Sequence, residues 1–173
     1  LRESTLFYGT VDITMNRGEG YSFLNIGKYI ERLLRSLDIL ELKIKELEKG
    51  GSEVTQWKYL LYSLSGYEFH TKYYRNVLST ENVIHQVILN MQFPHSALYC
   101  LSQANRYFKR LDVISVPEHF KEMEFLLGRA VSNLRYGGHE QKNVEQVKSL
   151  VLRTKIEIKE LSQKLASLYF GYS

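Results

Sequence analysis

Apolar residues recur along the chain at alternating steps of three and four, the spacing that places them on one side of an α-helix. The longest run is unbroken and stops just before Gly50-Gly51, where a helix would end. A second run with the same steps has Thr154 as its only polar member. The two runs consist of Phe23, Ile26, Ile30, Leu33, Leu37, Leu40, Ile44 and Leu47, and of Val144, Val147, Val151, Thr154, Ile158, Leu161, Leu165 and Leu168. They predict two long helices, because a β-strand has a period of two.

Shorter runs of the same kind predict helices over 54–64, 83–91, 97–111 and 120–134. Residues that break or cap helices fall between them: Ser52 precedes the first, and Gly137-Gly138 is expected to end the last. Segment 1–15 mixes helical spacing with residues that favour strands, and the helical remainder favours a helix there. The sequence therefore predicts an all-α fold, one antiparallel bundle of about seven helices with two long heptad-patterned helices.

Length and composition limit the class of protein. The chain has 173 residues, 44% hydrophobic and 24% charged, which suits one domain over 1–173. One cysteine and two prolines exclude a disulfide-built or collagenous protein. The heptad runs could also form a coiled-coil dimer, but the shorter helices need a partner surface too, and a single-chain bundle supplies it. Because the chain starts with Leu1 against predicted helix, we expect it to be a piece of a longer protein.

Charge and hydropathy bear on partners and location. No apolar run approaches the roughly 20 residues of a membrane helix, and the opening Leu1-Arg2-Glu3-Ser4 does not resemble a signal peptide. We therefore expect a cytoplasmic protein without a membrane partner. The 23 Lys and Arg exceed the 19 Asp and Glu to give a net charge of +4, but the two signs are interleaved, as on solvated helix faces. Nucleic-acid binding is therefore a distant alternative.

Residues that commonly carry catalysis or bind metals form no recognisable site. No two histidines lie three or four residues apart, and Glu81 with His85 lacks the second pair that a di-iron bundle requires, so we expect no metal and no cofactor. Cys100, in an apolar stretch, is expected to be a buried thiol. Tyrosines between Tyr59 and Tyr74 accompany Trp57 and several cations; they either stack on bases or a ligand, or pack between helices.

Three segments share a pattern with a known family. Asn25-Ile26-Gly27-Lys28-Tyr29-Ile30-Glu31-Arg32 resembles the Leu-Gly-Arg-Tyr-Leu-Glu-Arg-like run of the alpha-E family, predicted all-helical bacterial proteins named for a Glu-Arg pair. Thr14-Met15-Asn16-Arg17 with Glu19-Gly20-Tyr21-Ser22-Phe23 is similar to the segment leading into that helix. Phe93-Pro94-His95-Ser96 with Tyr99-Cys100-Leu101 is similar to a later Pro-Arg-Ser and Tyr-Cys run. Lys28 and His95 replace arginines of the family, Tyr21 a common Trp and Leu33 a usual Ala. The resemblance implies the C-terminal half of a longer family member.

The resemblance also implies partners. Family members tend to be encoded beside, or fused with, circularly permuted ATP-grasp enzymes and transglutaminase-like proteins, which suggests a part in forming or modifying peptide bonds. We expect a non-catalytic interaction or substrate-presenting partner of an ATP-grasp peptide ligase or a transglutaminase-like protein. The alternative is an enzyme subunit that binds a peptide or phosphorylated intermediate, and a deep pocket beside Glu31 and Arg32 would favour it. The candidate binding residues are Arg17, Gly27, Lys28, Glu31, Arg32 and Arg35.

Helix geometry predicts different roles for Glu31 and Arg32. A stripe of Leu24, Gly27, Glu31, Leu34 and Asp38 lies beside the main apolar run. Glu31 is therefore expected to be buried under a helix that approaches over Gly27, with its carboxylate paired. Another stripe holds Asn25, Lys28, Arg32, Arg35 and Ile39. Arg32 is expected to stay near solvent or to reach a carboxylate on another helix. The pair then either fixes helix register or forms a Glu-anchored basic ridge that grips an anionic group.

Overall fold

The structure, a computed structural model, describes residues 2–111, 117–139 and 143–171, which are helical apart from their turns and loops. The elements are α1 (Arg2–Thr14), α2 (Glu19–Glu48), α3 (Glu53–Ser63), α4 (Tyr67–Tyr73), α5 (Thr80–Ile84), the π-helix η1 (His85–Leu89), α6 (Ala97–Phe108), the 3₁₀ turn η2 (Lys109–Leu111), α7 (Pro117–His139) and α8 (Val144–Phe170). The predicted all-α bundle is confirmed. Among these helices, none is both long enough and apolar enough to cross a membrane.

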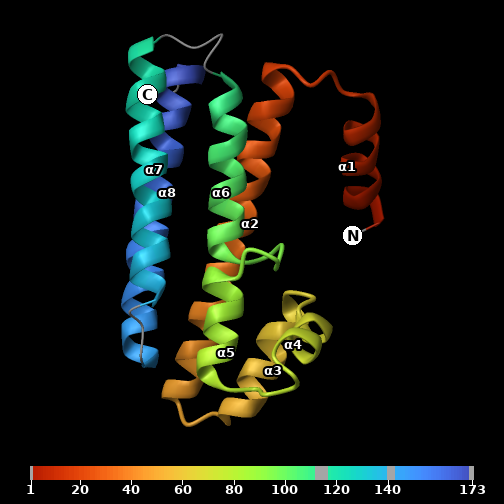
Figure 1. The fold of residues 1–173 in the computed structure, drawn as a ribbon, viewed down its shortest axis with the longest axis vertical. Helices are drawn as coiled ribbons and strands as arrows, with labels where there is room; N and C mark the ends of the chain where they lie inside the picture. Colours follow the sequence, from red (N-terminus) through yellow and green to blue (C-terminus); the bar gives the residue numbers. More distant parts are fainter. Residues whose placement is uncertain (1, 112–116, 140–142, 172–173) are drawn as a thin grey trace.

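Four helices form the body of the bundle. α2 packs against α6 and α8, and α7 packs against the same two helices from the opposite side. Successive members of this ring run in opposite directions (Figure 1). The short helices α3 and α4 lie at one end of the bundle, and α1 turns back beside the first half of α2 (Figure 1). This arrangement leaves one side of α2 and α6 facing α1.

The two predicted heptad runs are the inner faces of α2 and α8. Leu33, Leu37, Leu40 and Ile44 of α2 are fully buried, and Val151 and Ile158 of α8 are equally inaccessible. Thr154, the one polar member, is also buried within α8's inner face. Burial of a Leu or Ile side chain contributes about 2 kcal/mol, so these two faces provide much of the driving force for folding.

The structure differs from the predicted elements at two places. A separate helix, α4, forms within the tyrosine-rich segment, and the helix predicted over 83–91 is α5 continued as η1. α7 ends at His139, one residue after the predicted Gly137-Gly138. Gly138 also has a packing role, because a Cβ there would lie 2.5 Å from Cδ2 of Leu89. It therefore allows α7 to approach η1 closely.

The tyrosine-rich segment packs as a helical end piece. Trp57 is fully buried, and its Nε1 donates a hydrogen bond to Oγ1 of Thr80 at 2.9 Å. Around it the tyrosines stack on one another, as Tyr62 does on Tyr67 with ring centroids 4.6 Å apart. Lys58 lies over both of these rings. Trp57 is thus a core residue that joins α3 to α5.

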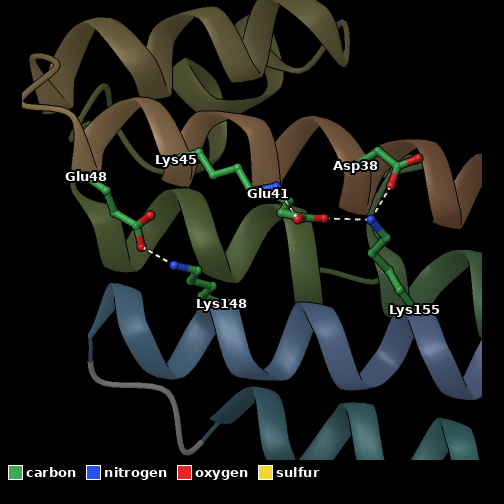
Figure 2. A network of polar contacts seen from close by, with 6 residues as sticks. All are labelled: Asp38, Glu41, Lys45, Glu48, Lys148 and Lys155. Atoms are coloured by element: carbon green, nitrogen blue, oxygen red, sulfur yellow. Dashed lines mark hydrogen bonds and ion pairs between the residues drawn. The ribbon is translucent and has the colours of Figure 1, made fainter.

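A row of ion pairs joins α2 to α8 along their outer edge (Figure 2). Lys155 of α8 reaches between two carboxylates of α2, with its Nζ 2.5 Å from Asp38 and 2.6 Å from Glu41. Glu41 also pairs with Lys45 at 2.7 Å. The side chains of Lys155 and Glu41 are only 16% and 21% exposed, so this pair is partly shielded from water. Its two lysine partners lower the pKa of Glu41 to about 2.

Acid is therefore expected to weaken the bundle through Glu41. A carboxyl whose pKa is lower in the folded state stabilises it above the unfolded pKa, near 4.5, and this contribution is lost as the pH falls towards 2. Glu41→Gln should cost about 2 kcal/mol at pH 7 and less at pH 3, in urea unfolding measured at both pH values. Glu46→Gln is the control, since Glu46 is more exposed and pairs only with Lys49. Equal losses for the two variants would refute the role of Glu41.

Candidate functional site

The three segments that share the family pattern meet on one side of the molecule. Arg32 of α2 donates a hydrogen bond from Nη1 to the carbonyl oxygen of Pro94 at 3.4 Å, which joins α2 to the turn before α6. Behind it, Tyr29 packs edge-to-face on Tyr99, with ring centroids 6.1 Å apart. The Sγ of Cys100 lies 3.5 Å from the same Pro94 oxygen. The hydrogen bond of Arg32 thus connects two segments that lie more than sixty positions apart in the sequence.

The segment before α2 reaches the same side. Arg17 lies over the ring of Tyr21, 4.2 Å from its centroid, and donates to the backbone oxygen of Asp12 in α1. The hydroxyl of Tyr21 donates to Oδ1 of Asp12 at 2.9 Å. The ring of Tyr21 packs edge-to-face on Tyr107 of α6, with centroids 5.9 Å apart. Asp12 therefore fixes α1 to the first turn of α2.

Cations and tyrosine rings alternate over this surface, which we call the basic–tyrosine face. Lys28 and Arg32 both lie over the ring of Tyr29, at 5.0 and 5.4 Å from its centroid. Arg110 lies 4.9 Å from the ring of Tyr107. The rings of Tyr29 and Tyr107 are stacked, with centroids 6.0 Å apart. Such cation–π contacts each contribute about 0.5–1 kcal/mol at exposed positions. The face comprises Arg17, Lys28, Tyr29, Arg32, Tyr99, Tyr107 and Arg110.

The face carries a surplus of positive charge. Lys28, Arg32 and Arg110 form no ion pair with any described residue, whereas Arg17 lies 3.7 Å from Asp12. Burial lowers the pKa of Lys28, the nearby Asp12 raises it, and Arg32 lowers it further. Burial, with the neighbouring Tyr99, raises the pKa of Tyr29, so that its hydroxyl stays protonated at neutral pH.

Glu31 does not lie where the stripe pattern predicted, and that prediction is wrong. Its side chain is 60% exposed and pairs only with Arg35 one turn later, at 2.9 Å. Gly27 is exposed too, with no neighbouring atom within 4 Å of the place a Cβ would occupy. The cause is the direction of approach, because α6 covers the side of α2 that carries Tyr29 and Arg32. No described helix approaches over Gly27 to cover Glu31.

Arg32 is half-buried and reaches across to another element, as expected, but its acceptor is a backbone carbonyl rather than a carboxylate. Arg35 lies outside this contact. Its side chain is 77% exposed and forms an ion pair with Glu31. The predicted ridge of three cations is therefore divided. Lys28 and Arg32 belong to the basic–tyrosine face, and Arg35 forms a local pair outside it.

Substitutions at the Glu-Arg pair should show this division. We expect Glu31→Gln to change the free energy of unfolding by less than about 0.5 kcal/mol, because an exposed i, i+4 ion pair contributes little. Arg32→Ala should cost about 1 kcal/mol, because it removes both the packing on Tyr29 and the bond to Pro94. Urea unfolding of the two variants measures the difference. A larger loss for Glu31→Gln than for Arg32→Ala would contradict the geometry described here.

The chemistry of the face is that of binding. None of the four pockets that we describe is lined by Glu31 or Arg32. Cys100 lies beneath the face, and burial raises the pKa of its thiol to about 12, so it is not a nucleophile at neutral pH. Within the described ranges, no group of three or more His, Cys, Asp or Glu side chains is placed to hold a metal ion. The face offers cations and aromatic rings at a surface.

Four members of the face were not among the candidate residues from the sequence: Tyr29 of α2, and Tyr99, Tyr107 and Arg110, which come from α6 and η2. The last three share a pattern. With Gln103 they recur at steps of four, four and three, which places them on one side of the helix. From the sequence, that spacing could have indicated that these residues share one side of a helix. It could not show that this side of α6 adjoins Tyr29 of α2, since the pairing of helices is set by the whole bundle.

The fold and the face define an all-helical bundle domain whose Glu-Arg pair lies at the edge of a basic, tyrosine-lined surface. The chain belongs to the Alpha-E family: the family model, described as a predicted alpha-helical domain with a conserved ER motif, matches residues 1–170. No curated protein matches the chain, and no solved structure does.

Proposed function

We propose that this domain is a non-catalytic interaction protein that presents the basic–tyrosine face to an acidic segment of a partner protein. The observation that carries the proposal is the charge of the face, where Lys28, Arg32 and Arg110 lie over tyrosine rings without a carboxylate partner among the described residues. Elsewhere on the bundle some cations are paired, as Lys148 is with Glu48 and Lys164 with Glu122, and Lys43 and Lys58 also lie over tyrosine rings. The basic–tyrosine face differs in that Lys28 and Arg32 share the ring of Tyr29, which stacks on Tyr107. Interfaces use arginine and tyrosine as anchors, and unpaired cations favour an acidic partner.

The expected partner is an ATP-grasp peptide ligase or a transglutaminase-like protein in the bacterial cytoplasm. This part of the proposal rests on the genetic neighbours of the family that the sequence resembles. The buried thiol of Cys100 and the position of Arg32 outside the four described pockets support a docking role over that of an enzyme subunit. A peptide or a phosphorylated intermediate, the alternative ligand, would need an enclosing pocket near Arg32.

Co-purification of the protein with its encoded ATP-grasp neighbour, followed by titration calorimetry, tests the proposal. Arg32→Ala and Arg110→Ala should each weaken binding about tenfold, and the affinity should fall as salt is added. Arg35→Ala is the matched control, because it removes an exposed arginine of the same helix that already pairs with Glu31. It should change the affinity by less than about twofold.

Thermal unfolding of each variant separates loss of binding from loss of structure. Full stability with tenfold weaker binding for Arg110→Ala supports the proposal, since Arg110 is exposed and, among the described residues, lies only over Tyr107 one turn earlier. Equal effects of Arg35→Ala and Arg110→Ala, or binding that is insensitive to salt, would overturn it.

Nucleic acid is the distant alternative occupant of a surface that carries cations and aromatic rings. The four cations of the face are too few to hold a strand at physiological ionic strength, because few phosphates would be neutralised together and the affinity gained from counterion release is small. We expect binding of single-stranded RNA to be weak and to vanish at physiological salt in fluorescence anisotropy. Sub-micromolar binding under those conditions would replace the proposed protein partner with a nucleic acid.

A further inference from the structure

A second site lies at the end of the bundle where η1 meets the ends of α7 and α8. The cavity there has a volume of about 780 Å³, within the range of small-molecule sites. Its wall includes Tyr74, Glu81, His85, His139 and Asn143, from the end of α4, from α5 and η1, and from the facing ends of α7 and α8. It shares no residue with the basic–tyrosine face. The two sites can therefore be tested separately.

The backbone around this cavity is specialised. η1 is a π-helix, a form that is rare and often found at functional sites. Gly138 packs directly against Leu89 of η1, because a Cβ at this position would lie 2.5 Å from Cδ2 of Leu89 and would require that side chain to move. This close approach brings His139, the next residue of α7, to the same cavity as His85. The π-helical turn of η1 and the close approach at Gly138 together place His85 and His139 on the wall of one cavity.

His85 is linked to two other residues by hydrogen bonds. Nδ2 of Asn90 donates to the hydroxyl oxygen of Tyr74 at 3.0 Å, and this hydroxyl lies 2.6 Å from Nδ1 of His85. The Tyr74 hydroxyl can therefore accept from Asn90 and donate its own proton to Nδ1. In that arrangement the proton of a neutral His85 is on Nε2, which is then a donor on a residue that lines the cavity.

The charges around the cavity favour an anion. Burial lowers the pKa of His85, as does the neighbouring His139, while Glu81 raises it. Glu81 is exposed, and it is the one carboxylate among the described residues that line the cavity. Asn143 caps α8, so the positive end of this 27-residue helix lies at the wall. An anion in the cavity would accept the proton of Nε2 and would lie near this positive helix end.

We propose that this cavity binds a small oxyanion, a phosphate or a carboxylate group, between His85 and His139. Tyr74 acts as a positioning residue that keeps the proton of His85 on Nε2. Both kinds of anion accept hydrogen bonds through oxygens that carry negative charge, and such charge-assisted bonds are among the strongest that proteins form.

Imidazole NMR of the full chain, titrated with inorganic phosphate and in parallel with acetate, tests the proposal. The resonances of His85 and His139 should shift saturably at millimolar anion, and those of His119 should not, because His119 lies outside the cavity at the other end of α7. The apparent pKa of His85 should rise as the anion binds. A response to phosphate alone identifies a phosphate site, and a response to acetate alone a carboxylate site. No saturable shift with either anion overturns the proposal.

Two variants separate the ligand from a structural effect. His85→Gln should weaken binding at least about fivefold, and Tyr74→Phe about threefold, the latter with the nitrogen-15 signature of a proton redistributed between the two ring nitrogens. His119→Gln is the control and should leave the affinity unchanged. Anion-dependent shifts that persist unchanged in both His85→Gln and Tyr74→Phe would show that the anion binds elsewhere, and would overturn the assignment.

Discussion

Replacement of Gln86 by Leu is expected to lower the free energy of unfolding by about 3 kcal/mol, although the two side chains have similar volumes. Gln86 is fully buried, its Nε2 donates to the carbonyl of Gly66 at 2.9 Å, and its Oε1 lies 2.7 Å from Nδ1 of His70. The other ring nitrogen of His70 lies 3.1 Å from the carbonyl oxygen of Val77. Leu at position 86 would leave the His70 ring nitrogen without its partner, and an unpaired buried group costs about 1–3 kcal/mol. It would also remove one of the two hydrogen bonds that the Gly66 carbonyl accepts, the other coming from the backbone N–H of His70.

Urea unfolding monitored by circular dichroism measures this loss. Gln103→Leu is the matched control, because it removes the same atoms from a partly exposed position of α6. It should change stability by less than about 0.5 kcal/mol. A loss below about 1 kcal/mol for Gln86→Leu would show that the buried network contributes little, and that η1 is held by apolar contacts alone.

Trp57→Ala is expected to cost about 4 kcal/mol, the largest loss that we predict for a single substitution. The side chain is fully buried, and its removal leaves a cavity at the junction of α3 and α5. The Oγ1 of Thr80 also loses the indole N–H that it accepts at 2.9 Å. Trp57→Phe should cost about half as much, since a ring still fills most of the space.

The measurement is urea unfolding followed by far-UV circular dichroism, because Trp57 is the one tryptophan of the chain and fluorescence would be lost with it. An unchanged slope against urea would show that the exposed area on unfolding is the same and that the loss is in stability. Equal costs for Trp57→Ala and Trp57→Phe would contradict the argument from the cavity, and would point instead to the hydrogen bond with Thr80.

The repeating pattern of apolar residues determined most of the helical architecture. The eight-residue runs of α2 and α8 are their buried faces, with the end members of each run partly buried, and Ser52 stands before the helix that it was expected to start. These features are local, since a helix and its buried side follow from residues three and four apart. The three segments of the family pattern were also evident from the sequence.

Only the tertiary structure decided what those segments do together. Glu31 and Arg32 are adjacent in sequence, yet one is exposed beside Arg35 and the other reaches Pro94 on the opposite side of α2. On a single helix, residues lie on both sides of the apolar run. The sequence pattern does not show which of these two sides is covered by a neighbouring helix. That choice depends on the direction from which α6 and α8 approach, and hence on the packing of the whole bundle.

The cavity at η1 could not be predicted from the sequence either. Glu81 and His85 were noticed only for their helical spacing, whereas His139 lies more than fifty residues further along the chain. Gly138, expected to end a helix, also provides the contact that brings His139 to the cavity. The sequence by itself determined the helices and their inner faces, because these depend on neighbours along the chain. The structure decided the two candidate sites, because each is made by side chains from helices that meet only after the bundle has packed.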